Sequence, residues 1–139
     1  MKREALKGRE FDWWAIDRDD HLALFATAGY GPIPEAVLHA TRSEDDDGEI
    51  LRRVVACLPQ SSKWNEQGRG PGKCDEWRDL GSRGVFVYDW LHWSGPYERV
   101  IEPLVPVLAA ALPSELRNIL RAVSISDSFA LTARAEAPP

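Results

Sequence analysis

The sequence is poor in the residues that build metal centres and disulfide frameworks. It contains two cysteines and three histidines in 139 residues. Cys57 and Cys74 are too far apart for a C-x-x-C motif, and the histidines show no H-x-x-H spacing. We therefore expect no metal site. A domain of this length can bury a sufficient core without disulfides, so we expect both cysteines to be free thiols.

Long apolar runs are also missing. The longest nearly uncharged run, residues 104–112, is far shorter than the roughly 20 residues that span a bilayer. The charged residues 1–10 are not followed by the apolar core of a secretory signal. We expect a cytoplasmic protein that does not bind a membrane.

Positive charge is in the minority. Lys and Arg number 17 against 22 Asp and Glu, which gives a formal net charge of −5. A whole-protein nucleic-acid binder normally has the opposite balance, so we expect no nucleic-acid partner. Apolar residues make up 44% and charged residues 28% of the chain. This mixture is typical of one ordinary globular domain and too apolar for a disordered chain.

A glycine-rich stretch, residues 68–74, superficially resembles a phosphate-binding loop. Gln67 stands where that motif requires its first glycine, and Cys74 stands where a Ser or Thr would reach Mg²⁺. The motif is therefore rejected, and the sequence predicts no cofactor.

Two pairs of short apolar runs predict β-hairpins. Residues 11–16 and 21–26 flank an Asp-rich turn, and residues 84–90 are followed by a Gly-Pro turn and by residues 97–101. Trp13 and Trp14 are consecutive, so a strand would send them to opposite faces.

Helical patterns lie between and after these hairpins. Pro34 suits the first turn of a helix over residues 35–40, apolar residues recur with helical spacing over 50–58, and a third helix enters at Leu112-Pro113. We predict a single α+β domain over residues 1–139, with an antiparallel sheet packed against two or three helices. Residues 59–83 are expected to form a long loop with a short helical turn near residues 75–80. Residues 123–125 are expected to form a last strand, and residues 1–10 and 133–139 frayed ends.

Acidic residues form two groups. Residues 43–49 carry five negative charges, which fits either the solvated start of a helix or a contact surface for a basic partner. A Ca²⁺ loop is disfavoured because its Asp, Gly and Glu positions are not in register. The second group lies around the first hairpin: Asp12, Asp17, Asp19 and Asp20. Turn chemistry explains these carboxylates more simply than acid–base catalysis.

Six tryptophans are unusual in a chain of this length. They are Trp13, Trp14, Trp64, Trp77, Trp90 and Trp93. Most are expected in the core, and one or two at a contact surface, because large rings with a polar N–H are favoured at interfaces.

The motifs of the two hairpins carry a family resemblance. Phe11-Asp12-Trp13-Trp14-Ala15-Ile16-Asp17, His21-Leu22-Ala23-Leu24-Phe25 and Gly29-Tyr30-Gly31-Pro32-Ile33-Pro34 are followed by Gly84-Val85-Phe86-Val87-Tyr88-Asp89, Tyr97-Glu98-Arg99-Val100, Pro103, Pro106, Leu112-Pro113 and Phe129. Over residues 11–38 and 84–129 the chain resembles small bacterial proteins that are similar to immunity proteins of polymorphic toxin systems. The chain departs from them at Asp20, where such proteins tend to carry Gly. This family pattern contains no catalytic residues.

The resemblance implies a protein that neutralises a bacterial toxin by binding it. If so, we expect acidic residues to steer a basic toxin and tryptophans to anchor it. The expected partner-binding residues are Glu44, Asp45, Asp46, Asp47, Glu49, Trp64, Trp90 and Trp93. Two alternatives stay open. One is a small enzyme with a pocket near His92 and residues 59–83, and the other is a regulatory or scaffold subunit.

Overall fold

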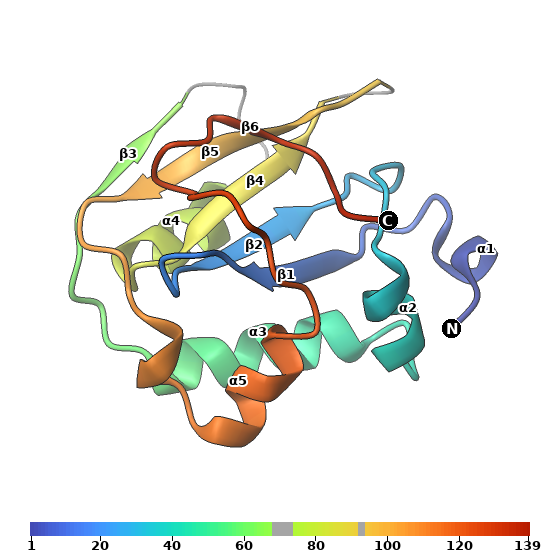
Figure 1. Ribbon diagram of the computed structural model, residues 1–139, viewed down its shortest axis with the longest axis horizontal. Helices are drawn as coiled ribbons and strands as arrows, with labels where there is room; N and C mark the ends of the chain where they lie inside the picture. The colour runs from blue at the N-terminus through green and yellow to red at the C-terminus, as the bar shows by residue number, and fades with distance from the viewer. Residues whose placement is uncertain (68–73, 92–93) are drawn as a thin grey trace.

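The fold is a single α+β domain in which a curled, mixed sheet packs against three substantial helices (Figure 1). The structure is a computed structural model, and the description covers residues 1–67, 74–91 and 94–139. Its strands are β1 (Asp12–Ile16), β2 (Leu22–Ala26), β3 (Trp64–Glu66), β4 (Phe86–Trp90), β5 (Tyr97–Pro103) and β6 (Arg134–Ala135). Its helices are α1 (Arg3–Leu6), α2 (Glu35–Ala40), α3 (Asp46–Cys57), α4 (Cys74–Ser82) and α5 (Ser114–Leu120), with a 3₁₀ turn, η1, at Ala109–Ala111.

The strand order is β1-β2-β4-β5-β3, with β6 added beside β5. Both predicted hairpins are confirmed: β1 pairs antiparallel with β2, and β4 pairs antiparallel with β5. The two hairpins are joined through a parallel pair, β2 with β4, which the sequence did not predict. In the part of the chain that the structure describes, no helix is both long and apolar enough to cross a bilayer.

The sheet separates two apolar clusters. One face is covered by α3, α4 and α5, and its core includes Trp14, Leu24 and Val87. The other face is covered by irregular chain, mainly the C-terminal segment that crosses the sheet in Figure 1. As predicted, Trp13 and Trp14 point to opposite faces, and both are buried.

An aromatic row links three neighbouring strands, β1, β2 and β4, on the face away from α3, α4 and α5. Trp13 stacks on Phe25 with ring centroids 4.1 Å apart, and Phe25 stacks on Tyr88 at 4.8 Å. These residues are also direct neighbours in the strand register. Stacked pairs of this kind add to the energy of area burial, so this row holds the parallel pair in one register.

The described residues among 59–83 are more ordered than the predicted long loop, and the helical turn expected near residues 75–80 lies within a longer helix. They contain β3, which pairs with β5, and α4, a helix of nine residues. Gly81 of α4 lies against Trp64 of β3, where an added Cβ would come within 3.0 Å of the Trp64 Cβ and 2.6 Å of Ile101. A three-residue strand has too little periodicity to be recognised, and glycine is a poor predictor of helix.

The chain ends are also more ordered than expected. The N-terminal ammonium donates hydrogen bonds to the carbonyls of Leu38 at 2.7 Å and Thr41 at 3.1 Å. At the other end, β6 pairs with the start of β5. Residues 123–125 run beside β1 as an isolated parallel bridge, Ile16 to Ser124, rather than as a full strand.

Candidate functional site

The acidic run forms the start of α3, which begins at Asp46, four residues before the expected start at Ile50. Asp46 Oδ2 accepts hydrogen bonds from the backbone N–H groups of Arg42 at 2.7 Å and Ser43 at 3.2 Å, which fixes the turn before the helix. Carboxylates in the first turn also stabilise the positive end of the helix dipole. The interpretation as a helix start is therefore confirmed for this residue.

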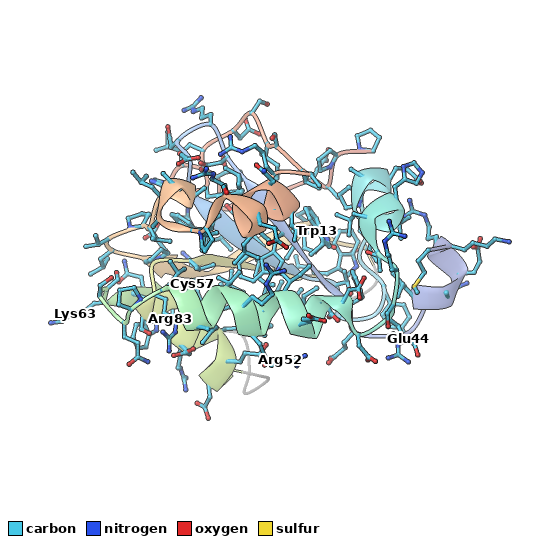
Figure 2. All side chains as sticks on the ribbon, turned by 90° about the horizontal axis from the view of Figure 1, so that it is seen from below. Trp13, Glu44, Arg52, Cys57, Lys63 and Arg83 are labelled. Carbon is cyan, nitrogen blue, oxygen red and sulfur yellow. The ribbon has the colours of Figure 1, made fainter. Side chains whose placement is uncertain are left out.

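The other acids of the run face outward to different degrees. Glu44 forms an ion pair of 3.2 Å with Arg9, while Asp45 and Glu49 are exposed. Figure 2 shows Glu44 beside one end of α3, and Arg52 and Cys57 farther along the helix. Cys57 is an exposed free thiol, and the side chain of Cys74 lies outside the described residues. The start of α3 thus presents negative charge to solvent.

Asp12 connects this helix start to the sheet. Its backbone N–H donates a 3.0 Å hydrogen bond to Asp47 Oδ2. In the strand register, Asp12 of β1 and Asp89 of β4 are both neighbours of Ala26 on β2. They therefore lie on the same helix-covered face, two strand spacings or about 10 Å apart.

Three further carboxylates from three other elements, those of Asp47, Glu76 and Asp89, lie near enough to Asp12 for their charges to act on it. We call these four residues the acidic end. The pKa of Asp12 is raised from its ordinary value of 3.8 to about 7, mainly by burial and in addition by the negative charges of Asp47, Glu76 and Asp89. A carboxyl in such surroundings gains from any cation that approaches it. The acidic end is thus suited to receiving a positive group.

A small cavity of about 60 Å³ opens beside the acidic end. Asp12, Asp46 and Asp47 supply its acidic wall, and Ile50 and Ile119 belong to its apolar wall. The lining comes from β1, α2, α3 and α5. Its combination of carboxylates and apolar side chains suits the end of a lysine or arginine side chain, which has an apolar stem and a charged head.

The predicted tryptophan anchors do not join the acidic run. Trp64 lies on β3, four strands from β1 in the sheet order, and is half-buried against the helix-covered core. Trp90 lies on the opposite face, half-buried, with its ring centroid 4.9 Å from that of Tyr97. Trp93 and His92 lie outside the described residues. Among the described residues, the structure therefore brings together the five acids of the run but places neither Trp64 nor Trp90 beside them.

The remaining acids of the first hairpin have a structural role. Asp17 is buried, and its two oxygens accept hydrogen bonds from the backbone N–H groups of Asp19, His21 and Phe129 at 2.9, 2.9 and 2.7 Å. Asp17, Asp19 and His21 also offer possible metal-ligand atoms within 4.8 Å of one another. Because the Asp17 carboxylate already accepts hydrogen bonds from three backbone N–H groups, its position is explained by its structural role in the turn.

Sequence reasoning missed the part of the site formed by Asp12, Glu76 and Asp89. Asp12 was grouped with the turn acids, yet it lies at the other end of β1. The available signal was weak: Asp12 and Asp89 each lie next to the aromatic residues of a strand. Only the parallel pairing of β2 with β4 shows that these two acids share a face.

Comparisons of the chain with protein-family models, with curated proteins and with solved structures find no match.

Proposed function

We propose that this protein is an immunity-like inhibitor that neutralises a cognate bacterial toxin in the cytoplasm by direct contact, and that the acidic end receives a basic segment of that toxin. The observation that supports this most strongly is the convergence of carboxylates from β1, α3, α4 and β4 around Asp12. Such a cluster repels itself in the free protein. A cationic partner would relieve that repulsion.

The surface around the acidic end supports electrostatic steering. Asp45, Glu49 and Glu76 are exposed there, and the whole chain carries a net charge of −5. Charges of one sign around a docking site raise the association rate for a partner of opposite sign, and this effect falls as salt rises. Binding should therefore weaken at high ionic strength.

The cavity beside Asp12 offers a place where one side chain of the partner can bind, in addition to the long-range attraction by the negative surface. A lysine or arginine inserted there would place its charge against Asp12 and Asp47 and its stem against Ile50 and Ile119. Such binding favours the ionised form of Asp12. Affinity should therefore increase as the pH rises from about 6 to 8, across the pKa of about 7.

The test is affinity capture with the purified full chain, from lysate and secreted fractions of the source cells at low and high salt. One variant neutralises the exposed acids near the site, Asp45→Asn, Glu49→Gln and Glu76→Gln. A matched control neutralises three exposed acids elsewhere, Glu115→Gln, Asp127→Asn and Glu136→Gln. Both variants gain the same charge, so the comparison separates a local site from overall charge.

We expect a basic protein that is captured by the wild type and the control variant, is lost at high salt, and binds the site variant at least tenfold more weakly. When that protein is expressed in a bacterial host and arrests growth, co-expressed wild type should restore growth and the site variant should not. Equal binding by both variants, or binding that leaves the toxicity unchanged, would refute the proposal.

A further inference from the structure

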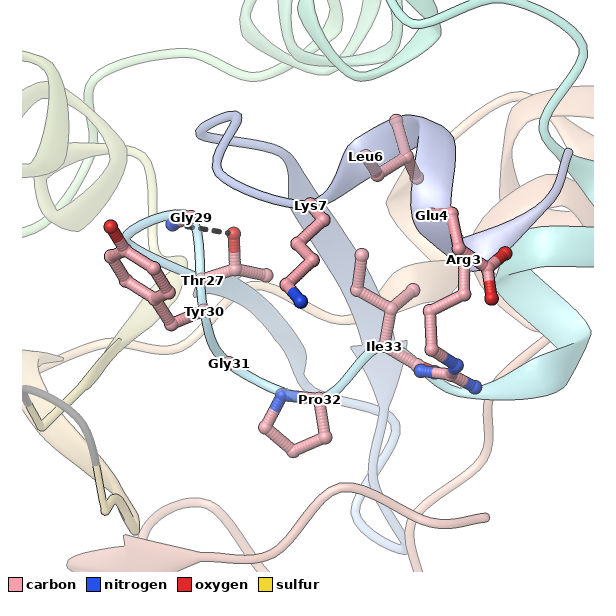
Figure 3. A pocket seen from close by; sticks show the side chains of 10 residues that line it. All are labelled: Arg3, Glu4, Leu6, Lys7, Thr27, Gly29, Tyr30, Gly31, Pro32 and Ile33. Atoms are coloured by element: carbon pink, nitrogen blue, oxygen red, sulfur yellow. Dashed lines mark hydrogen bonds between the residues drawn. The ribbon is translucent and has the colours of Figure 1, made fainter.

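A second and larger cavity lies away from the acidic end. It has a volume of about 450 Å³ and lies between the N-terminal segment with α1 and the loop of residues 27–33 (Figure 3). Leu6, Ile33 and Pro32 give it apolar walls, and Tyr30, a residue that is 51% exposed, also lines it. Its size falls in the range of small-molecule sites, which is roughly 300–1,000 Å³.

The two walls of this cavity are tied together at both ends. At one end the Gly8 N–H donates to the Gly29 carbonyl at 3.0 Å. At the other end Arg3 Nη1 donates to the Ile33 carbonyl at 2.9 Å, and Arg3 Nη2 pairs with Glu35 at 2.7 Å. The cavity is therefore formed before any ligand arrives, which lowers the entropic cost of binding.

Gly29 is required for this arrangement. Its φ is +85°, and an added Cβ would lie 3.3 Å from the Gly8 carbonyl carbon and oxygen. A residue with a side chain would be strained by the backbone conformation and would push the two walls apart. The Gly-Tyr-Gly-Pro sequence of this loop thus has a direct structural explanation.

One cation enters the cavity. Figure 3 shows the Lys7 side chain running between Thr27 and Ile33, with the Glu4 carboxylate turned away from it. Within the described ranges Lys7 Nζ has no ion-pair or hydrogen-bond partner. The other cation of the lining, Arg3, is already paired with Glu35. An anion in the cavity would therefore meet one available positive charge.

The hydrogen bonds that the loop backbone already makes limit which kind of anion the cavity can bind. The amide N–H groups of Tyr30 and Gly31 donate to the Thr27 carbonyl at 3.0 and 2.8 Å, and that of Gly29 donates to Thr27 Oγ1 at 3.3 Å. A phosphate group needs several such donors, and here they are engaged. A carboxylate needs fewer donors and is matched by one ammonium group.

From these observations we infer that this cavity binds a small organic carboxylate with an apolar or aromatic body. The carboxylate pairs with Lys7, and the body packs against Leu6, Ile33 and Tyr30. The acidic end contributes nothing to this site, so the inference is independent of the proposed inhibitor function.

Three probes test the inference by ¹H–¹⁵N NMR titration at constant ionic strength: phenylacetate, its neutral isostere phenylacetamide, and inorganic phosphate. The amides of Lys7, Gly29, Tyr30 and Gly31 report on the cavity. We expect saturable shifts of these amides with phenylacetate and binding at least tenfold weaker with phenylacetamide and with phosphate.

The Lys7→Met variant, which keeps the length of the side chain but removes its charge, should weaken phenylacetate binding about tenfold. Lys63→Met is the matched control because Lys63 is an exposed lysine at a distant place in the fold (Figure 2), and it should bind like the wild type. A Lys7→Glu variant should lose phenylacetate binding altogether. The spectra themselves report whether each variant is folded.

Three results would overturn the inference. These are the absence of saturable shifts at the cavity amides, equal affinity for the acid and the amide, and unchanged phenylacetate binding by Lys7→Met. Tighter binding of phosphate than of phenylacetate would refute the assigned ligand class.

Discussion

At the residue scale, the first turn is stabilised by hydrogen bonds to two aspartates, Asp17 and Asp20, rather than by a glycine. Asp20 has a φ of +63°, a conformation that glycine favours and aspartate tolerates. Its carboxylate accepts a hydrogen bond from the Ala110 N–H at 3.2 Å and approaches Arg121 at 3.4 Å. These contacts offset the backbone strain, so the chain forms this hairpin with an aspartate at a position where glycine is favoured.

Asp17 is expected to be the most sensitive residue of this turn. Asp17→Ala would leave the backbone N–H groups of Asp19, His21 and Phe129 without their acceptor. We expect it to lower the free energy of unfolding by about 3 kcal/mol, measured by urea denaturation. The control is Asp19→Ala at an exposed position, which should cost less than about 0.5 kcal/mol. Equal effects of the two substitutions would contradict this account.

At the element scale, local pattern predicted both hairpins, the helices α2, α3 and α5, and a helical turn within α4, but not α1. It did not predict the parallel pairing of β2 with β4, because the connection between them contains α2, α3, β3 and α4. Short elements were missed for a different reason: β6 has two residues and β3 has three, too few for a periodic signal. The start of α3 was placed too late because its first turn is acidic rather than apolar.

The C-terminal end of α3 is held by Arg83, the residue that follows the last residue of α4. The Arg83 guanidinium donates to the Val55 carbonyl at 3.2 Å and to the Leu58 carbonyl, and Arg83 also pairs with Asp79 at 3.1 Å. These bonds satisfy carbonyls that a helix end leaves without partners. Arg83 therefore joins the end of α4 to the end of α3.

Arg83→Met should lower the free energy of unfolding by about 2 kcal/mol, because it removes charge-assisted hydrogen bonds to the helix end. Arg83→Lys should recover only part of this loss, since lysine lacks the planar fork of donors. Arg52→Met on the exposed side of α3 is the control and should be nearly neutral. Equal unfolding midpoints in urea for Arg83→Met and Arg52→Met would show that Arg83 does not hold the helix end.

At the scale of the whole molecule, the acidic end exists only because the fold assembles it. The acidic run was visible in the sequence, and its place at a helix start followed from charge pattern. The meeting of Asp12 with Glu76 and Asp89 requires the sheet register and the position of α4. Asp12 thus lies half-buried among carboxylates, where an approaching cation would stabilise its charged form.

The raised pKa of Asp12 makes the free energy of unfolding depend on pH. The folded-state pKa of Asp12, about 7, lies above its ordinary value of 3.8. Between about pH 4 and pH 7 the folded protein therefore holds a proton that the unfolded chain has released, so the Asp12 contribution to the free energy of unfolding falls as the pH rises. Asp12→Asn removes this contribution. It should be more stable than the wild type at pH 8 by on the order of 2 kcal/mol, with the difference shrinking towards pH 4.

The shifted pKa of Glu66 does not alter the stability difference between the wild type and Asp12→Asn. Glu66 has a lowered pKa because Arg78 donates hydrogen bonds to it, and this change acts in the opposite direction. It is present in both the wild type and Asp12→Asn, so it cancels in their difference. A difference that does not vary between pH 4 and pH 8 would contradict the prediction.

The most direct measurement is the pH titration of the Asp12 side-chain carboxyl carbon by NMR, in the free protein. We expect a midpoint near 7, and a lower midpoint once a basic partner occupies the acidic end. A midpoint near the ordinary value of 3.8 in the free protein would show that the carboxylates do not crowd Asp12, and would remove the main support for a cation-binding site.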